Sequence, residues 1–161
     1  METNKVDLPL CLRRVQGSDL GILYEIQIDP LANAMAVANP RTRDEFFEHW
    51  RRVLADPAVI ARTIVMGGRV SGSISCFELD ERTYVGYWIA RESWGRGIAT
   101  RALELFLDEV ATRPLWARVA ISNAASARVL EKCGFVEHAR MMSEETPRFP
   151  ACEESLMRLD A

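Results

Sequence analysis

Residues 87–101 constrain the fold of this chain more tightly than any other segment. They read YWIARESWGRGIATR: an apolar run typical of a strand, a turn containing Gly95 and Gly97, and the beginning of a helix. Because glycine has no Cβ, the backbone can turn sharply here and a ligand can reach its N–H groups. The first turn of the helix adds unpaired N–H groups and the positive end of the helix dipole. The segment therefore predicts a binding site for a phosphate or pyrophosphate group.

Two familiar phosphate-binding loops do not fit these residues. The P-loop pattern G-x-x-x-x-G-K-[ST] does not occur in the sequence. A dinucleotide-binding loop needs a third glycine or alanine, where this chain has Thr100. It also needs an acidic residue about twenty positions on, and residues 115–120 contain none. On these letters alone, the two glycines could equally do no more than shape a strand-to-helix turn.

A second motif lies downstream, at residues 123–135, which read NAASARVLEKCGF. With both motifs in this order, the chain resembles the GNAT N-acetyltransferase superfamily, and within it the Rim-type branch that acetylates ribosomal-protein N-termini. Members carry a pyrophosphate loop of the form Q/R-x-x-G-x-G/A, here WGRGIA at residues 94–99. They then carry a helix that begins at an Asn, here Asn123, and ends in Gly-Phe. The resemblance covers the chain from about residue 10 onward.

The resemblance implies a mixed α/β fold of the GNAT type. Its central, mostly antiparallel, twisted sheet would have six to seven strands with about four helices, and its strands would part at the acetyl-CoA site. A length of 161 residues, 48% of them hydrophobic and 27% charged, suits one domain with a single core. No repeat, low-complexity tract or linker divides the sequence. We therefore expect a single acetyltransferase domain over residues 1–161.

Hydrophobic periodicity and turn residues predict where the elements lie. The predicted strands cover residues 10–15, 60–66, 69–77, 83–90, 115–120, 135–141 and 154–159. The predicted helices lie between Ser18, a candidate N-cap, and Asp29-Pro30, between Thr42 and Pro57, and over residues 97–112 and 123–133. Thr42 and Glu45 form a capping-box signature, and Gly67-Gly68 predicts a tight hairpin. The second helix carries an apolar stripe that consists of Phe46, Phe47, Trp50, Val53 and Leu54.

The resemblance also implies a co-substrate, acetyl-CoA, and the residues that hold it. Backbone N–H groups of residues 94–100 would bind its pyrophosphate. The pantetheine arm would lie between the parted strands, where main-chain groups near Trp88 and Ile89 would meet the thioester. The acceptor amine would then attack the thioester directly, without an acyl-enzyme. The residues expected to bind the co-substrate are Trp88, Ile89, Trp94, Gly95, Arg96, Gly97, Ile98, Ala99, Thr100 and Asn123.

Trp94 stands where Gln or Arg is commoner in the loop, and two further departures from the superfamily pattern concern proton transfer. Many members have a Tyr seven residues after the motif Asn to protonate the leaving thiolate, but this chain has Leu130. Rim-type proteins have a Ser three residues after the Asn, so the resemblance gives this role to Ser126, directly or through water. Ser126 could also serve only to satisfy N–H groups at the helix start.

The second departure concerns the general base. Tyr84 stands where a Glu is usual, and it is our second catalytic candidate. A tyrosine with an ordinary pKa near 10 is a poor base at neutral pH, so cross-strand packing or substrate contact suits it better. Glu78, Glu81 and Glu92 remain alternatives as the base.

The lack of an obvious base favours one kind of acceptor. At pH 7 about one α-amine in seven is already neutral, compared with fewer than about one lysine in a thousand. We therefore expect an N-acetyltransferase acting on a protein or peptide N-terminus. Two alternatives stay open: acetylation of a small amine such as an antibiotic or polyamine, and a non-catalytic acyl-CoA-binding module. The sequence also leaves open whether the protein is a homodimer.

Composition argues against several other classes. A net charge of −3 gives no electrostatic support for binding nucleic acid. Four scattered cysteines without a C-x-x-C pair, and only two histidines, predict reduced thiols and no metal site. No apolar run approaches the roughly 20 residues of a membrane span, and residues 1–10 show no signal-peptide core. We therefore expect a cytoplasmic protein.

Overall fold

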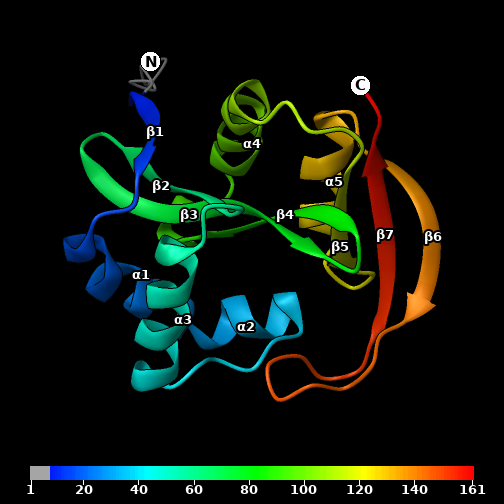
Figure 1. Ribbon diagram of the computed structural model, residues 1–161, viewed down its shortest axis with the longest axis horizontal. Coiled ribbons are helices and arrows are strands. Elements are labelled where there is room, and N and C mark those ends of the chain that lie inside the picture. The colour runs from blue at the N-terminus through cyan, green and yellow to red at the C-terminus, as the bar shows by residue number, and fades with distance from the viewer. Residues whose placement is uncertain (1–7) are drawn as a thin grey trace, which may run out of the picture.

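Seven strands form one sheet in the order β1-β2-β3-β4-β5-β7-β6, with helices on both faces (Figure 1). The computed structural model describes residues 8–161, so most of the segment searched for a signal peptide lies outside the described residues. The strands are β1 (Leu10–Arg14), β2 (Ile60–Met66), β3 (Arg69–Leu79), β4 (Arg82–Ile89), β5 (Leu115–Ala120), β6 (Val136–Met142) and β7 (Glu153–Leu159). All seven predicted strands are confirmed.

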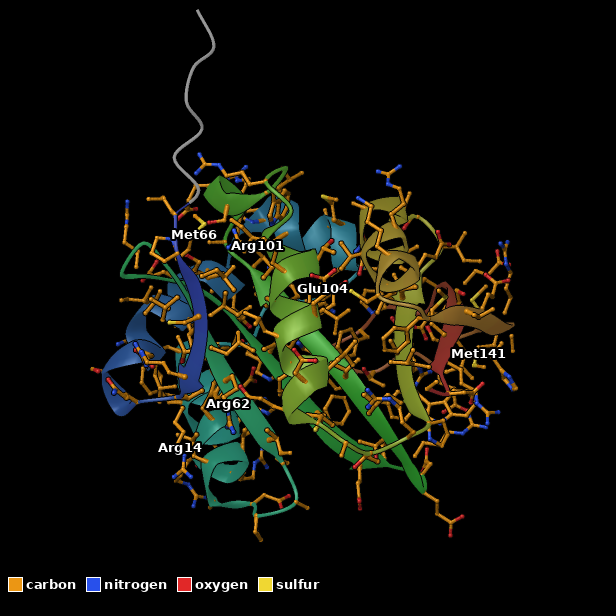
Figure 2. The ribbon with its side chains drawn as sticks, turned by 90° about the horizontal axis from the view of Figure 1, so that it is seen from above. Arg14, Arg62, Met66, Arg101, Glu104 and Met141 are labelled. Carbon is orange, nitrogen blue, oxygen red and sulfur yellow. The ribbon has the colours of Figure 1, made fainter. Side chains whose placement is uncertain are left out.

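Five α-helices cover the sheet. On one face lie α1 (Leu20–Gln27), α2 (Pro30–Ala36) and α3 (Arg43–Ala55), and on the other lie α4 (Ile98–Glu109) and α5 (Ala124–Lys132) (Figure 1). Figure 2 views the sheet from the face that α4 crosses. The mixed α/β fold is confirmed, with five helices in place of about four.

The additional helix, α2, begins where the sequence analysis expected only an end. Asp29-Pro30 does stop α1, but it also starts α2: the Asp29 carboxylate accepts a hydrogen bond from the Leu31 N–H at 3.0 Å, and Pro30 occupies the first helical position. Proline suits that position because its fixed φ is already helical and no N–H is needed there. The prediction for Ser18 was wrong, because Ser18 lies inside a 3-10 turn, η1 (Gly17–Asp19), and α1 follows from Asp19.

Local signals elsewhere were read correctly. The Glu45 N–H donates to Thr42 Oγ1 at 3.3 Å and the Thr42 N–H donates to Glu45 Oε2 at 3.0 Å, which completes the predicted capping box of α3. Phe46 and Trp50 of the apolar stripe are buried, whereas Leu54 at the end of the helix is 48% exposed. Only the part of the stripe that faces α1 and β3 therefore belongs to the core.

The sheet separates between β4 and β5. These parallel neighbours share a single register pair, Tyr84 with Trp116, whereas every other pair of neighbouring strands is matched over at least five positions. On one face α4 packs Leu103 and Phe106 onto buried residues of the central strands, so the sheet stays joined through its core. The expected parting of the strands is confirmed.

The buried carboxylate of Asp19 joins η1 to strands β1 and β2. Asp19, whose side chain is 4% exposed, accepts two hydrogen bonds from the Arg13 guanidinium, at 2.7 and 2.8 Å. It also accepts from Thr63 Oγ1 at 2.9 Å and from the Gln16 N–H at 2.8 Å. The hydrogen bond from Arg13 is the main reason that the pKa of Asp19 falls to about 2, against the opposing effect of burial.

We predict that Asp19→Asn lowers the free energy of unfolding by about 2 kcal/mol at pH 7. The folded-state pKa lies below the unfolded value near 4, so the contribution exists above pH 4 and is lost as the pH falls toward 2. Urea unfolding between pH 7 and pH 2.5 measures it, with Glu48→Gln on an exposed ion pair as the control. Equal stability of Asp19→Asn and the natural protein at pH 7 would contradict the prediction.

A second prediction concerns the close approach of β3 and β4. A Cβ at position 72 would lie 2.2 Å from the Trp88 carbonyl oxygen and 3.1 Å from Ile89 Cα, both backbone atoms. Gly72→Ala should therefore lower the free energy of unfolding by about 2 kcal/mol. The matched control is Gly86→Ala on β4, where the nearest atom would be Phe77 Cε1 at 3.9 Å. Thermal unfolding of both variants tests the prediction, and similar melting temperatures would refute it.

Candidate active site

A cleft of about 680 Å³ opens where β4 and β5 part. Its walls come from α1 and α3 on one side, from β3, β4 and β5 at its floor, from the first turn of α5, and from the loop between β6 and β7. In Figure 1 that loop passes beneath the sheet toward α2. Segments far apart in the sequence therefore surround one space next to the parted strands.

The glycine turn lies between β4 and α4. Gly95 and Gly97 have φ values of 74° and 72°, in the left-handed region that glycine adopts at little cost. Among the described residues, no acceptor lies within hydrogen-bond distance of the amide N–H groups of residues 95–100. These amides and the positive end of α4 have the arrangement that binds an anion.

Side chains of the same segment hold the turn in place. The indole Nε1–H of Trp94 donates to the Ile89 carbonyl oxygen at 3.0 Å, and its ring packs against the core. Ile98 is buried in that core and Ala99 packs against it, whereas Arg96 is exposed. The side chains of Trp94, Ile98 and Ala99 therefore hold the turn in place. The backbone N–H groups of the turn remain available to a ligand.

Trp88 and Ile89 lie at the end of β4, on the edge that no longer pairs with β5. The Trp88 indole donates to the Ile26 carbonyl oxygen of α1 at 3.1 Å, which fixes its half-buried ring in the wall of the cleft. Ile89 is buried. The backbone polar groups of residues 85–89 that do not pair with β3 thus face the gap between β4 and β5.

Asn123 and Ser126 begin α5 on the other side of the gap. The Asn123 side chain caps the helix by accepting a hydrogen bond from the Ser126 N–H at 3.2 Å. The Ser126 hydroxyl makes a separate hydrogen bond, at 2.8 Å, with the hydroxyl of Tyr87. Ser126 therefore does more than satisfy the helix start, because its hydroxyl is engaged with a side chain of β4.

Tyr87 is the residue that the sequence analysis missed. Its side chain is half-buried, and burial raises its pKa to about 12, so the phenol keeps its proton at neutral pH. The alternation of side chains along β4 could have pointed to Tyr87. It shares a face with Val85 and Ile89, whose side chains pack beneath α4 and α5. That face is the one from which Ser126 approaches.

Tyr84 lies on the opposite face of β4. Its ring is buried, stacks on Phe77 with centroids 6.1 Å apart, and packs with Trp116 and Leu156. The two catalytic candidates, Ser126 and Tyr84, both line the cleft but belong to different sides of the sheet. The geometry of Tyr84 matches the cross-strand packing that the sequence analysis weighed for it.

Other groups that could carry chemistry are sparse in the described part of the chain. Residues 8–161 contain no cluster of three or more His, Cys, Asp or Glu side chains suited to a metal ion. Cys11, Cys76, Cys133 and Cys152 form no disulfide with one another. No described helix has the length and apolar character needed to cross a bilayer.

Comparison with known proteins identifies the family. The family model of the acetyltransferase (GNAT) domain matches residues 9–136. The chain is 30% identical over 155 residues to "Putative ribosomal N-acetyltransferase YdaF" of Bacillus subtilis (strain 168), covering 87% of this chain and 85% of that protein.

Solved structures agree with the fold. A spermidine N-acetyltransferase from Vibrio cholerae, in complex with CoA and spermine, superposes with a TM-score of 0.81 at 20% identity, covering 94% of this chain and 95% of that one. The ribosomal L7/L12 alpha-N-protein acetyltransferase RimL gives a TM-score of 0.81 at 18% identity, over 94% and 90% of the two chains. With the parted strands, the glycine turn and the family match in agreement, this chain belongs to the GNAT acetyltransferase family.

Proposed function

We propose that this protein transfers the acetyl group of acetyl-CoA directly to the α-amine of a protein or peptide N-terminus. The observation that carries the proposal is that three features adjoin the parted end of β4. These are the unpaired amides of residues 95–100, the parted edge of β4, and the hydrogen-bonded pair of Ser126 and Tyr87.

Acetyl-CoA would lie along the glycine turn and in the gap between β4 and β5. Its pyrophosphate binds the backbone amides of residues 95–100 at the start of α4, with Arg96 exposed beside them. Its pantetheine arm follows the gap between β4 and β5 and brings the thioester to the main chain of Trp88 and Ile89, opposite Asn123. An N–H group directed at the thioester oxygen stabilises the tetrahedral transition state, by about 3 kcal/mol per donor in acyl-transfer enzymes.

Ser126 and Tyr87 then provide the proton for the leaving group. The amine nitrogen bonds to the acetyl carbon, the carbon–sulfur bond breaks, the nitrogen releases one proton to water, and the thiolate needs one. Ser126 donates its hydroxyl proton, directly or through water, while Tyr87 donates its own to Ser126 across their 2.8 Å hydrogen bond. The phenol keeps its proton at neutral pH in the resting enzyme, and the proton that the amine nitrogen released restores it through solvent once CoA has left.

The choice of an α-amine rests on proton chemistry. An α-amine with an ordinary pKa near 7.8 is partly neutral at pH 7, so no strong base is required to free its lone pair. Tyr84, where a Glu is usual, is buried against Phe77 and Trp116 and does not supply such a base. YdaF and RimL are named as acetyltransferases of ribosomal proteins, which supports an N-terminal α-amine as the acceptor. The spermidine N-acetyltransferase has the same fold, so a polyamine is the second candidate.

We predict that Ser126→Ala lowers kcat with an N-terminal peptide about a hundredfold and that Tyr87→Phe lowers it about tenfold, because each removes a step of the proton relay. Single-turnover rates of acetyl transfer measure both variants, with mass spectrometry to locate the acetyl group. Tyr84→Phe is the matched control and should stay within about threefold, since it keeps the packed ring. Full activity of Ser126→Ala would contradict the proposed role, and a large loss in Tyr84→Phe would place that hydroxyl in the reaction.

We also predict that Gly97→Ala weakens CoA binding by about tenfold. An alanine at a φ of 72° costs roughly 1 to 2 kcal/mol, and the turn relieves that strain by moving the amides that face the pyrophosphate. Isothermal titration calorimetry measures the dissociation constant. Gly21→Ala, in α1 with no atom within 4 Å of the new Cβ, is the control and should bind CoA normally. Unchanged affinity in Gly97→Ala would remove the turn from the binding site.

A further inference from the structure

Three nitrogen donors gather in the part of the cleft that lies beneath Trp88. They belong to Gln27 at the end of α1, Arg41 before α3, and Arg148 in the loop between β6 and β7, and all three side chains line the cleft. We refer to them as the donor cluster. Each of the three has hydrogen-bonding capacity that the described protein does not use.

Gln27 shows this most directly. Its side chain is buried, with 4% of the residue exposed, and its Oε1 accepts the backbone N–H of Arg41 at 2.7 Å. That bond fixes the orientation of the amide, so Nε2 is the remaining donor. Nε2 is buried and has no acceptor among residues 8–161. A buried donor without a partner loses its hydrogen bond to water and gains none in the protein, so it favours an incoming acceptor.

Arg148 is held beside the site of transfer. The Asn39 N–H donates to the Arg148 carbonyl oxygen at 2.7 Å and the Arg148 guanidinium donates to the Asn39 carbonyl oxygen, which joins the loop to the end of α2. The guanidinium carbon lies 5.4 Å from the centre of the Trp88 ring. Its buried Nε also lacks an acceptor among the described residues.

Neither arginine forms an ion pair within the described residues, although the charge of Glu45 acts on Arg41 and partly offsets the effect of burial on its pKa. Burial, and then the nearby Arg41, lowers the pKa of Arg148 to about 10, and burial lowers the pKa of Arg41 as well. His49 lies among the same charges, and burial together with Arg41, Arg52 and Arg148 lowers its pKa to about 4, so it is neutral at pH 7.

The acidic groups near this region are mostly occupied. Glu45 accepts the Thr42 N–H in the capping box, and Asp29 pairs with Arg91 at 2.9 Å. At the far wall of the cleft Glu154 pairs with Arg118 at 3.1 Å, which leaves Glu144 as an exposed carboxylate at the mouth. Two close guanidinium groups repel each other, and an anion between them would relieve that repulsion.

We propose that the donor cluster of Gln27, Arg41 and Arg148 is an anion subsite that binds a carboxylate of the acceptor. The inference rests on the proposed function and narrows its substrate class to peptide N-termini with an Asp or Glu at position 2 or 3. Extended chain advances about 3.3 to 3.6 Å per residue, so an acceptor whose amine reaches the main chain of Trp88 places its second or third side chain beside Arg148. A polyamine brings further positive charges to the same place and is repelled.

The test compares matched peptides that differ only at positions 2 and 3, which are acidic, neutral or basic, together with spermidine. We expect kcat/KM for the acidic peptide to exceed that for the basic peptide by at least tenfold. Arg41→Gln and Arg148→Gln should each lower kcat/KM about tenfold for the acidic peptide and leave the neutral peptide within about threefold. Arg14→Gln is the control, because Arg14 lies at the end of β1, outside the cleft lining (Figure 2).

Arg148→Glu keeps a long charged side chain in the loop and provides a reciprocal test. It should reverse the preference, so that the basic peptide is acetylated faster than the acidic one. Equal losses with all three peptides in the arginine variants would show a merely structural role and overturn the proposal. Faster turnover of free amino acids than of the acidic peptide would overturn the assignment to peptides.

Failure of the anion subsite and failure of the proposed function give different results. If the natural protein acetylates acidic, neutral and basic peptides equally well, the anion subsite is wrong and the proposed function stands. If it acetylates spermidine and no peptide, the proposed function itself is wrong.

Discussion

The separation of β4 from β5 is the constraint on which the rest of this structure depends. Two parallel strands joined at the single pair of Tyr84 and Trp116 leave residues 85–89, which pair with β3 on one edge, without a partner strand on the edge toward β5. Backbone N–H and C=O groups need partners, so such a gap persists only where water or a ligand can supply them. The packing of α4 and α5 across the gap keeps the strands in place while the edge stays open.

Every functional group described here takes its position from that gap. The glycine turn follows directly from the free end of β4, Ser126 approaches from the start of α5, and Tyr87 meets it from β4 at 2.8 Å. The opposite face of β4 carries Trp88, against which Arg148 packs. One strand therefore separates the group that would protonate the thiolate from the groups that would select the acceptor, as a reaction between two substrates requires.

The elements that sequence could predict are those whose signals are local. The capping box of Thr42 and Glu45, the hairpin at Gly67-Gly68 and the glycine turn all depend on neighbouring residues, and each lies where it was expected. Asp29-Pro30 predicts the end of α1 but did not predict the beginning of α2, because the same two residues are typical of either helix terminus. The pair of Tyr87 and Ser126 spans 39 positions, and the approach of Arg148 to Asn39 spans 109. Only the folded chain brings such residues together.

The most direct measurement of the central claim is hydrogen–deuterium exchange at single-amide resolution, with and without saturating CoA. If the parted strands and the glycine turn form the binding site, CoA should slow exchange at the amides of residues 95–100 and along residues 85–89 of β4. The amides of β1 and β2, which pair with each other in full, should not change. Protection confined to another surface, or no protection at all in the folded protein, would contradict the account.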